Sequence, residues 1–141
     1  MNPLISDSTE WACAQVTLDF FYALDMRRYS EVAALMASDG TWFRQGAELL
    51  GPEGVLAALN ARPVSRTTCH IISNLRVELN NEAKPPRART CFYLTAYDND
   101  AAQDSPALRL VAIRDCCDEL IKTEAGWRIS EKRSRRHLPP E

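Results

Sequence analysis

The spacing of hydrophobic residues near the start of the chain is typical of an amphipathic helix. Four hydrophobic residues recur there at helical intervals: Trp11, Val16, Phe20 and Leu24. The polar segment before and beside them, residues 6–10, offers hydroxyl and carboxylate oxygens to the free N–H groups of a helix start. The pattern therefore predicts a helix over residues 8–26, with its hydrophobic face buried.

Two shorter helices and a short strand are predicted next. One helix begins at Tyr29 and is expected to stop at Asp39-Gly40. Residues 41–44 are rich in β-forming side chains and predict a strand. A further helix begins at Gly51-Pro52, because a proline in the first helical turn gives up no N–H that the helix needs.

The hydrophobic period changes from 3.6 to 2 in the second half of the chain. Four strands are predicted, at about 67–80, 87–98, 106–122 and 126–137. Asn, Asp, Pro and Gly residues between them supply turn chemistry. Helices followed by long consecutive strands indicate an α+β fold, in which a strongly curved antiparallel sheet packs helices on one face. With neither repeat nor linker, residues 1–141 are expected to form one domain.

Length and charge narrow the function classes. The chain has 141 residues and a net charge of −2, which argues against a general nucleic-acid binder, since such proteins carry a basic patch. The one basic run, residues 131–137, is expected to be a solvated edge strand and tail. No hydrophobic run reaches the ~18 residues that span a bilayer, and the N-terminus has no secretory pattern. We expect a cytoplasmic protein that binds neither nucleic acid nor membrane.

The cysteines indicate neither a metal site nor a disulfide framework. Five are present: Cys13, Cys69, Cys91, Cys116 and Cys117. Their odd number and their spacing favour free, buried thiols in a reducing compartment. The adjacent Cys116 and Cys117 should point to opposite faces of a strand. Nothing in the chain indicates a metal or an organic cofactor.

An aspartate and a histidine far apart in sequence are the candidate chemistry. The chain has two histidines, and His137 lies in the basic tail, so His70 is the only plausible interior imidazole. Asp25 ends the first predicted helix, where the helix dipole disfavours an acid, and a specific partner is expected. If the two meet, the carboxylate would fix the tautomer of the imidazole and stabilise its protonated form. The alternatives are a structural core histidine and an Asp25 paired with neighbouring arginines.

Five short segments follow one another in a set order. They are Leu24-Asp25 with Arg28-Tyr29, Asp39-Gly40-Thr41-Trp42, Gly51-Pro52-Glu53-Gly54-Val55, Thr68-Cys69-His70-Ile71-Ile72-Ser73-Asn74 and Gly126-Trp127-Arg128-Ile129. In this order they resemble the nuclear transport factor 2-like cone fold and, within it, the SnoaL-type polyketide cyclase group. The resemblance covers nearly the whole chain and implies a conical pocket inside the curved sheet.

Two branches of that superfamily are similar to the chain. Asp25 and His70 match the Asp and His that scytalone-dehydratase-like and bile-acid-dehydratase-like members use as an acid–base dyad. Residues 65–78 and 118–129 look like parts of the small (beta) subunit of aromatic-ring-hydroxylating dioxygenases. In that second role the fold is a scaffold, and the catalytic iron and cluster belong to a separate large subunit.

The resemblance also implies a set of pocket residues. They are Phe21, Trp42, Arg44, Phe92, Ala96 and Cys116. Two of them depart from the dehydratase pattern: Ala96 stands where a second His or an Asp is expected, and Arg44 stands where those enzymes place a tyrosine. Arg44 either binds an anionic group of the substrate or pairs with Glu48.

The resemblance implies a cofactor-independent dehydratase, isomerase or cyclase that acts on a hydrophobic, cyclic or polyketide-like small molecule through the Asp25–His70 dyad. The alternatives are a non-catalytic dioxygenase small subunit bound to a Rieske-type large subunit, an orphan relative of one, and a ligand-binding module without turnover. Apolar residues such as Val111 and Ile113 on one sheet face predict a homo-oligomer. A dimer is expected, and a trimer would favour the dioxygenase alternative.

Overall fold

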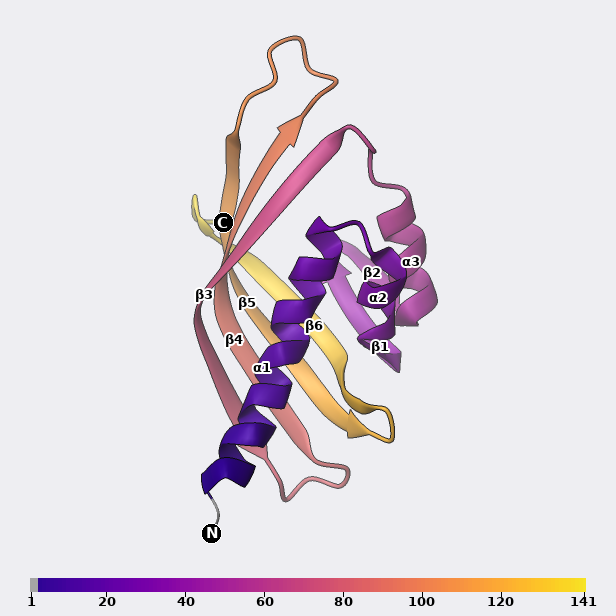
Figure 1. Ribbon diagram of the computed structural model, residues 1–141, viewed down its shortest axis with the longest axis vertical. Coiled ribbons are helices and arrows are strands. Elements are labelled where there is room, and N and C mark those ends of the chain that lie inside the picture. Colours follow the sequence, from indigo (N-terminus) through magenta and orange to yellow (C-terminus); the bar gives the residue numbers. More distant parts are fainter. Residues whose placement is uncertain (1–2) are drawn as a thin grey trace.

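Three helices lie against one face of a curved six-stranded sheet (Figure 1). The computed structural model describes residues 3–141, with side chains from residue 8 onward. The helices are α1 (Pro3–Asp25), α2 (Tyr29–Ala34) and α3 (Gly51–Asn60). The strands are β1 (Met36–Arg44), β2 (Ala47–Leu50), β3 (Arg66–Asn80), β4 (Arg87–Asp100), β5 (Arg109–Thr123) and β6 (Gly126–Leu138). The predicted α+β class with a curved sheet is confirmed.

The sheet has the order β2-β1-β6-β5-β4-β3 and is mixed. β1 runs parallel to β6, whereas every other neighbouring pair is antiparallel, so the prediction of a purely antiparallel sheet is wrong at this one pairing. The prediction of a helix reaching Asp39-Gly40 is also wrong. α2 ends at Ala34, and Met36 already pairs with Ile129, whose amide donates to the Leu35 carbonyl at 2.8 Å. Pairing with β6 therefore outweighs the local helical pattern.

A bulge in β3 gives the sheet its concave face. The register passes from Ser73 opposite Tyr93 to Arg76 opposite Cys91, so β3 has one extra residue there. Asn74 takes up the irregularity with a φ of 54°, a conformation that asparagine tolerates better than most residues. A bulge of this kind bends its strand and reverses which residues face inward. Consequently His70, before the bulge, and Val77, after it, both face the helices.

A second bulge, in β6, has the same effect. Leu120 is opposite Ile129, but Glu119 is opposite Glu131, which leaves Ser130 as the extra residue. Ile129 is fully buried before the bulge, and Lys132 is buried after it. The side chain that the bulge turns inward is therefore a lysine.

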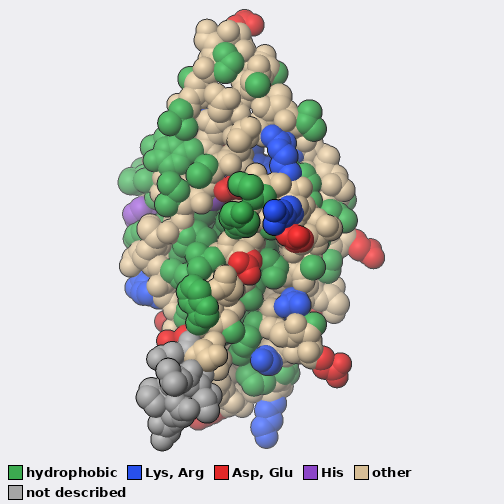
Figure 2. All heavy atoms as spheres, viewed as in Figure 1, with side chains coloured by type: hydrophobic (Ala, Val, Ile, Leu, Met, Phe, Trp, Pro, Cys, Tyr) green, Lys and Arg blue, Asp and Glu red, His purple; other side chains and the backbone are tan. Residues whose placement is uncertain are grey.

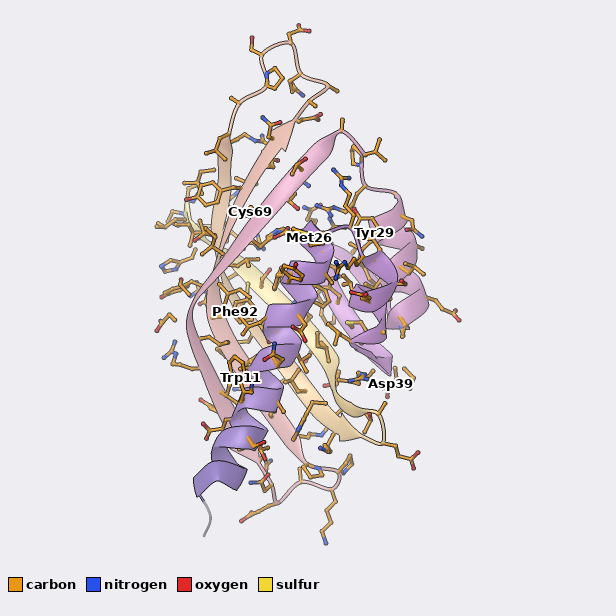
Figure 3. The ribbon with its side chains drawn as sticks, viewed as in Figure 1. Trp11, Met26, Tyr29, Asp39, Cys69 and Phe92 are labelled. Carbon is orange, nitrogen blue, oxygen red and sulfur yellow. A yellow bond between two sulfur atoms is a disulfide. The ribbon has the colours of Figure 1, made fainter. Side chains whose placement is uncertain are left out.

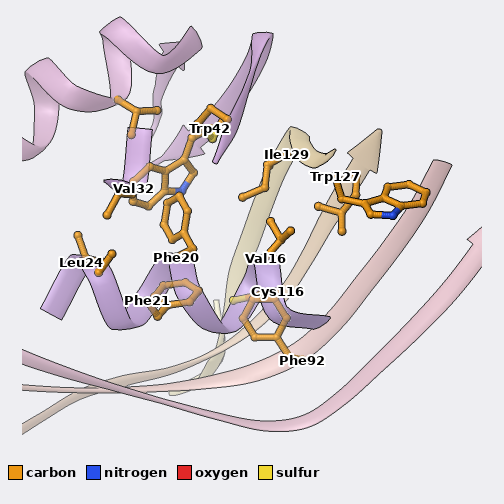
Figure 4. Packing of buried hydrophobic residues seen from close by; sticks show 14 of the residues in the cluster. Val16, Phe20, Phe21, Leu24, Val32, Trp42, Phe92, Cys116, Trp127 and Ile129 are labelled. Carbon is orange, nitrogen blue, oxygen red and sulfur yellow. The ribbon is translucent and has the colours of Figure 1, made fainter. Parts of the chain in front are cut away.

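The hydrophobic core fills the space between α1 and the sheet. Its largest fully buried side chains include Phe20, Leu59, Leu120 and Ile129, and burial of each contributes about 1.5–3 kcal/mol. Figure 4 shows Phe20 beside Trp42, with which it makes an edge-on contact at 5.2 Å between ring centroids. Trp11, in the N-terminal half of α1, was expected on the buried face, but its side chain is 60% exposed (Figure 3).

The expected boundaries are otherwise close to those observed. The four long strands lie where the alternation placed them, and α3 begins at Gly51 as predicted. The short strand β2 was not predicted. One boundary is wrong: α1 begins at Pro3, so residues 6–10, which were expected to start and cap the helix, lie within it.

Two cysteines correct the prediction of free thiols. Cys91 on β4 and Cys117 on β5 are directly opposite in the strand register, with Cα atoms 4.3 Å apart, and form a disulfide. Cys13 and Cys116 are free and buried, and burial raises the pKa of their thiols to about 11 and about 12. Cys69 is free and exposed on the outer face of β3 (Figure 3). Only the fold reveals the pairing, because it depends on the register between two strands.

Hydrophobic side chains are exposed along the upper part of the long strands. Ile71 is 49% exposed and Leu110 is 55% exposed, while Val111 is 39% exposed and Ile113 is half-buried. Figure 2 shows hydrophobic side chains gathered on the left of the view, where the outer face of these strands is seen edge-on. The expected homo-oligomer remains a prediction.

No helix in the described part of the chain is long and apolar enough to cross a membrane.

Candidate active site

Asp25 and His70 are in direct contact. Asp25 is the last residue of α1, and His70 lies on the concave side of β3. The Asp25 Oδ1 atom lies 2.7 Å from the His70 Nδ1 atom, and the His70 backbone N–H donates to Oδ2 at 2.8 Å. The side chains are only 10% and 13% exposed. The partner expected for an acid at this helix end is therefore present.

The Asp25 carboxylate accepts a third hydrogen bond, from the Thr68 hydroxyl at 2.8 Å. Burial opposes ionisation of Asp25, but the hydrogen bonds from the His70 ring, the His70 amide and Thr68 outweigh it and hold the pKa of Asp25 below its ordinary value. An ionised carboxylate only accepts hydrogen bonds, so His70 Nδ1 carries the proton. The other ring nitrogen, Nε2, has no hydrogen-bond partner among the described residues.

His70 forms part of the wall of a cavity of about 170 Å³. The apolar part of the wall includes Phe21, Leu24, Trp42, Leu94, Ala96 and Cys116. An engineered apolar cavity of about 150 Å³ binds benzene, so the enclosed space matches about one six-membered ring. The exposed residues Gln45 and Ser134 also line the cavity, which therefore reaches the surface.

Five of the six pocket residues expected from sequence line this cavity: Phe21, Trp42, Arg44, Ala96 and Cys116. Phe92 does not. It is 2% exposed and packs edge-on behind Phe21, with ring centroids 5.9 Å apart (Figure 4). Phe21 itself contacts the His70 ring at 5.2 Å between centroids. Phe92 therefore supports the wall instead of forming it.

Ala96 lies directly opposite His70 in the register of β3 and β4. The position at which the resemblance implied a second His or an Asp is thus next to His70 in the strand pairing, which the sequence did not predict. Because it carries only a methyl group, it cannot supply a proton. At this part of the wall, Asp25 and His70 are the only acid–base pair that the described residues form.

The remaining wall is basic. Six cationic side chains line the cavity: Arg44, Arg62, Arg66, Arg114, Lys132 and Arg133. No carboxylate lies among the lining residues within the described part of the chain. Sequence reasoning identified only Arg44 of this group. The Arg44 guanidinium lies over the Trp42 ring, 5.3 Å from its centroid, and does not form the ion pair with Glu48 that the sequence left open.

The expectation that residues 131–137 form a solvated edge strand is wrong, because β6 lies inside the sheet between β1 and β5 and Lys132 is buried. Lys132 is therefore the functional candidate that sequence reasoning missed. Its Nζ atom donates to both carboxylate oxygens of Asp118, at 3.0 Å and 2.9 Å. Asp118 is completely buried, and the Lys132 side chain is 5% exposed. Burial raises the pKa of Asp118, although the Lys132 ammonium and a hydrogen bond from Thr17 act in the opposite direction.

Aromatic rings surround the Lys132 ammonium. Its Nζ atom lies 4.3 Å from the centroid of Phe20 and 4.5 Å from that of Phe21. Such contacts favour a cation over the ring face. Lys132 is thus a charge held in place by packing and by Asp118, on the same cavity wall as His70.

Metal chemistry has no evident ligand set here. Within residues 8–141, no three His, Cys, Asp or Glu side chains are grouped in a way that could hold a metal ion. The side chains that the site does present are one oriented imidazole, an apolar wall and several positive charges.

Solved structures with the same architecture span almost the whole chain. A protein from Catenulispora acidiphila aligns with a TM-score of 0.80 at 15% identity, covering 96% of both chains. A type 2 hexachlorocyclohexane dehydrochlorinase (LinA) aligns at 0.79 with 19% identity, covering 96% of this chain and 90% of its own. A scytalone dehydratase-like protein from Novosphingobium aromaticivorans aligns at 0.76 with 18% identity, covering 95% and 85%. At these identities the likeness establishes the fold.

The family is established by sequence. No curated protein matches the chain, but the family model described as SnoaL-like domain matches residues 8–133. That match includes most of α1, the dyad, the bulges of β3 and β6, and Lys132. The chain therefore belongs to the SnoaL-like domain family.

Proposed function

We propose that this protein is a cofactor-independent acid–base enzyme of the dehydratase, isomerase or cyclase kind, which acts on a small cyclic molecule. The observation that carries the proposal is the 2.7 Å contact between Asp25 Oδ1 and His70 Nδ1, at the wall of a cavity that is partly apolar and partly basic. A half-exposed, unpartnered histidine would have neither a fixed tautomer nor a stabilised charged form. Here the carboxylate provides both.

The dyad supports a proton transfer in two stages. His70 Nε2 removes a proton from the carbon next to a carbonyl, and the electron pair of the broken C–H bond moves to the carbonyl oxygen as an enolate. The imidazolium, stabilised by Asp25, then returns the proton. If the proton is returned to another carbon of a conjugated enolate, the reaction is an isomerisation. If it is delivered to a β-hydroxyl as the enolate re-forms the carbonyl, the C–O bond of that hydroxyl breaks, water leaves, and a double bond forms between the α and β carbons.

The fixed positive charge of Lys132 is suited to the intermediate of this reaction. A cation held in a low-dielectric site stabilises developing negative charge without having to reorient. Lys132 is ordered by Asp118 and by the rings of Phe20 and Phe21. Two proteins of the same fold are named as a dehydrochlorinase and as a scytalone dehydratase-like protein, which is consistent with elimination chemistry on this scaffold.

The proposal is tested by proton exchange, which needs no knowledge of the natural substrate. Cyclic ketones and β-hydroxy ketones are incubated with the protein in D₂O, and loss of the α-proton signal is followed by NMR. Replacing His70 with Gln should reduce the catalysed exchange by about 10²–10⁴-fold, and Asp25→Asn should reduce it less, because the imidazole stays near its position.

The matched control is His137→Gln. His137 stacks on Tyr93 with ring centroids 5.1 Å apart and does not line the cavity, so its loss should leave exchange unchanged. Melting curves establish that each variant is folded. Catalysed exchange that survives in folded His70→Gln would contradict the proposal.

A further inference from the structure

The charged side chains of the cavity wall are all positive. The ion pairs that they form show which of these positive charges are neutralised by a carboxylate. Four of the six cations have a carboxylate within 4.0 Å: Arg66 with Asp98, Arg114 with Glu141, Lys132 with Asp118 and Arg133 with Glu131. Arg44 and Arg62 have no such partner among the described residues. Arg44 and Arg62 are therefore the two lining cations that form no ion pair at all within the described part of the chain, whereas Arg66 shares Asp98 with Arg109.

These two groups are held in place. Arg62 donates to the Tyr29 hydroxyl at 3.2 Å and to the Thr68 hydroxyl at 3.1 Å. Arg44 is half-buried and stacked on Trp42. Burial, together with the charges of Arg62 and Arg66, lowers the pKa of Arg44. Partial burial of a cation without a counter-ion is energetically unfavourable. The positive charges of Arg62 and Arg66 make the position of Arg44 in the cavity wall more unfavourable still.

A bound anion would remove that cost. Guanidinium groups present planar N–H donors that match the two oxygens of a carboxylate, and such charge-assisted hydrogen bonds are stronger than neutral ones. The location is also suitable for a substrate of the dyad, since the Thr68 hydroxyl that accepts from Arg62 donates to Asp25. A ligand held by Arg62 would therefore have its anionic end close to the dyad, with its ring in the apolar part of the cavity.

We infer that the substrate is a monocyclic carboxylate, with its carboxylate bound by Arg44 and Arg62 and its ring enclosed beside His70. The inference rests on the proposed function in one respect, that the same cavity receives the substrate. It narrows the substrate class from hydrophobic cyclic molecules in general to anionic ones. The enclosed volume of about 170 Å³ limits the buried part to about one ring.

The test is a comparison of two probes of nearly the same shape, one an anionic carboxylate and the other a neutral amide. Isothermal titration calorimetry measures the binding of 4-methylbenzoate and of 4-methylbenzamide, which have nearly the same shape. Neither probe has a carbon acid next to a carbonyl, so binding is measured apart from turnover. We expect 4-methylbenzoate to bind at least about tenfold more tightly, because hydrogen bonds to a charged group contribute more than neutral ones. Its affinity should also fall as NaCl is added.

Variants identify the groups responsible. Arg44→Gln and Arg62→Gln should each lower the affinity for 4-methylbenzoate about tenfold and leave that for 4-methylbenzamide within about twofold. Arg76→Gln is the matched control, since Arg76 carries the same charge but is exposed on the outer side of β3 and does not line the cavity. Its affinities should equal those of the parent.

The outcomes separate this inference from the proposed function. Equal affinity for the two probes, no saturable binding of 4-methylbenzoate, or loss of its binding in Arg76→Gln as large as in Arg44→Gln would overturn the inference. The measurement is repeated on His70→Gln, in which carboxylate selectivity should persist because the arginines are intact. Selective binding in a protein without proton-exchange activity would therefore support the carboxylate site while the proposed enzyme function fails.

Discussion

Removing the Lys132 ammonium should destabilise the protein strongly, because its partner cannot reach water. In Lys132→Met the apolar stem is largely retained, but Asp118, with no exposed surface, keeps only Thr17 as a hydrogen-bond donor, at 3.3 Å. Breaking a buried pair by removing one partner costs about 3–5 kcal/mol. For a domain of this size that corresponds to a fall of roughly 10–15 °C in Tm.

The assay is urea unfolding of the parent, of Lys132→Met and of the double variant Lys132→Met with Asp118→Leu. Replacing both charges with apolar groups is often close to neutral. Thr17 would still bond to Thr90, at 2.7 Å. We expect the double variant to be at least about 2 kcal/mol more stable than Lys132→Met, since it contains no isolated buried charge.

The pH dependence distinguishes lost charge from lost packing. Burial already raises the pKa of Asp118 in the parent, and removal of Lys132 raises it further. A group whose pKa is raised in the folded state contributes stability that is present at low pH and lost as pH rises through that pKa. The deficit of Lys132→Met should therefore shrink on acidification. A deficit below about 1 kcal/mol, or one that the second substitution does not relieve, would refute the reasoning.

Three further predictions follow from other parts of the structure. The pKa of Asp25 lies below its ordinary value of 3.8, so the stability that the Asp25 carboxylate contributes is complete above pH 3.8 and is lost as the pH falls below it. In an acid titration followed by circular dichroism, the folded signal should therefore fall less steeply for Asp25→Asn than for the parent. The Cys91–Cys117 disulfide closes a loop with a sequence separation of 26, so a reducing agent should lower the free energy of unfolding in urea by up to about 3.5 kcal/mol. Unchanged stability would argue against a bond in solution. Sedimentation at micromolar concentration should show a dimer, and Ile71→Lys, which puts a charge on the exposed apolar face, should shift the protein towards monomer. A clean monomer of the parent would exclude the dimer. A trimer would favour the dioxygenase-subunit alternative.

The four long strands and the two residues of the dyad could be predicted from sequence because their signals are local or scarce. The alternation in β3 to β6 gives the long strands directly. With two histidines in the chain, only His70 lies in a segment that can be buried, and Asp25 stands where a helix end disfavours an acid. Neither argument requires knowledge of which strands pair.

The missed residues depend on register, which the sequence pattern does not contain. Strict alternation from Trp127 and Ile129 would turn Glu131 inward and Lys132 outward, and only the bulge at Ser130 reverses this. The disulfide likewise requires that Cys91 lie opposite Cys117. Arg62 lies outside every strand and helix, so no periodicity points to it.

The bulge in β6 also bears on which strand pairing the chain can adopt. A slip of one residue in the second half of β6 would exchange its two faces and bring Glu131 towards the buried Asp118 in place of Lys132. Two carboxylates would then share a site closed to water, with no cation between them. The lysine–aspartate pair therefore selects one pairing over its nearest competitor. Because β6 joins β1 and β2 to the three long strands, that choice fixes how the two parts of the sheet meet and where the cavity between them forms.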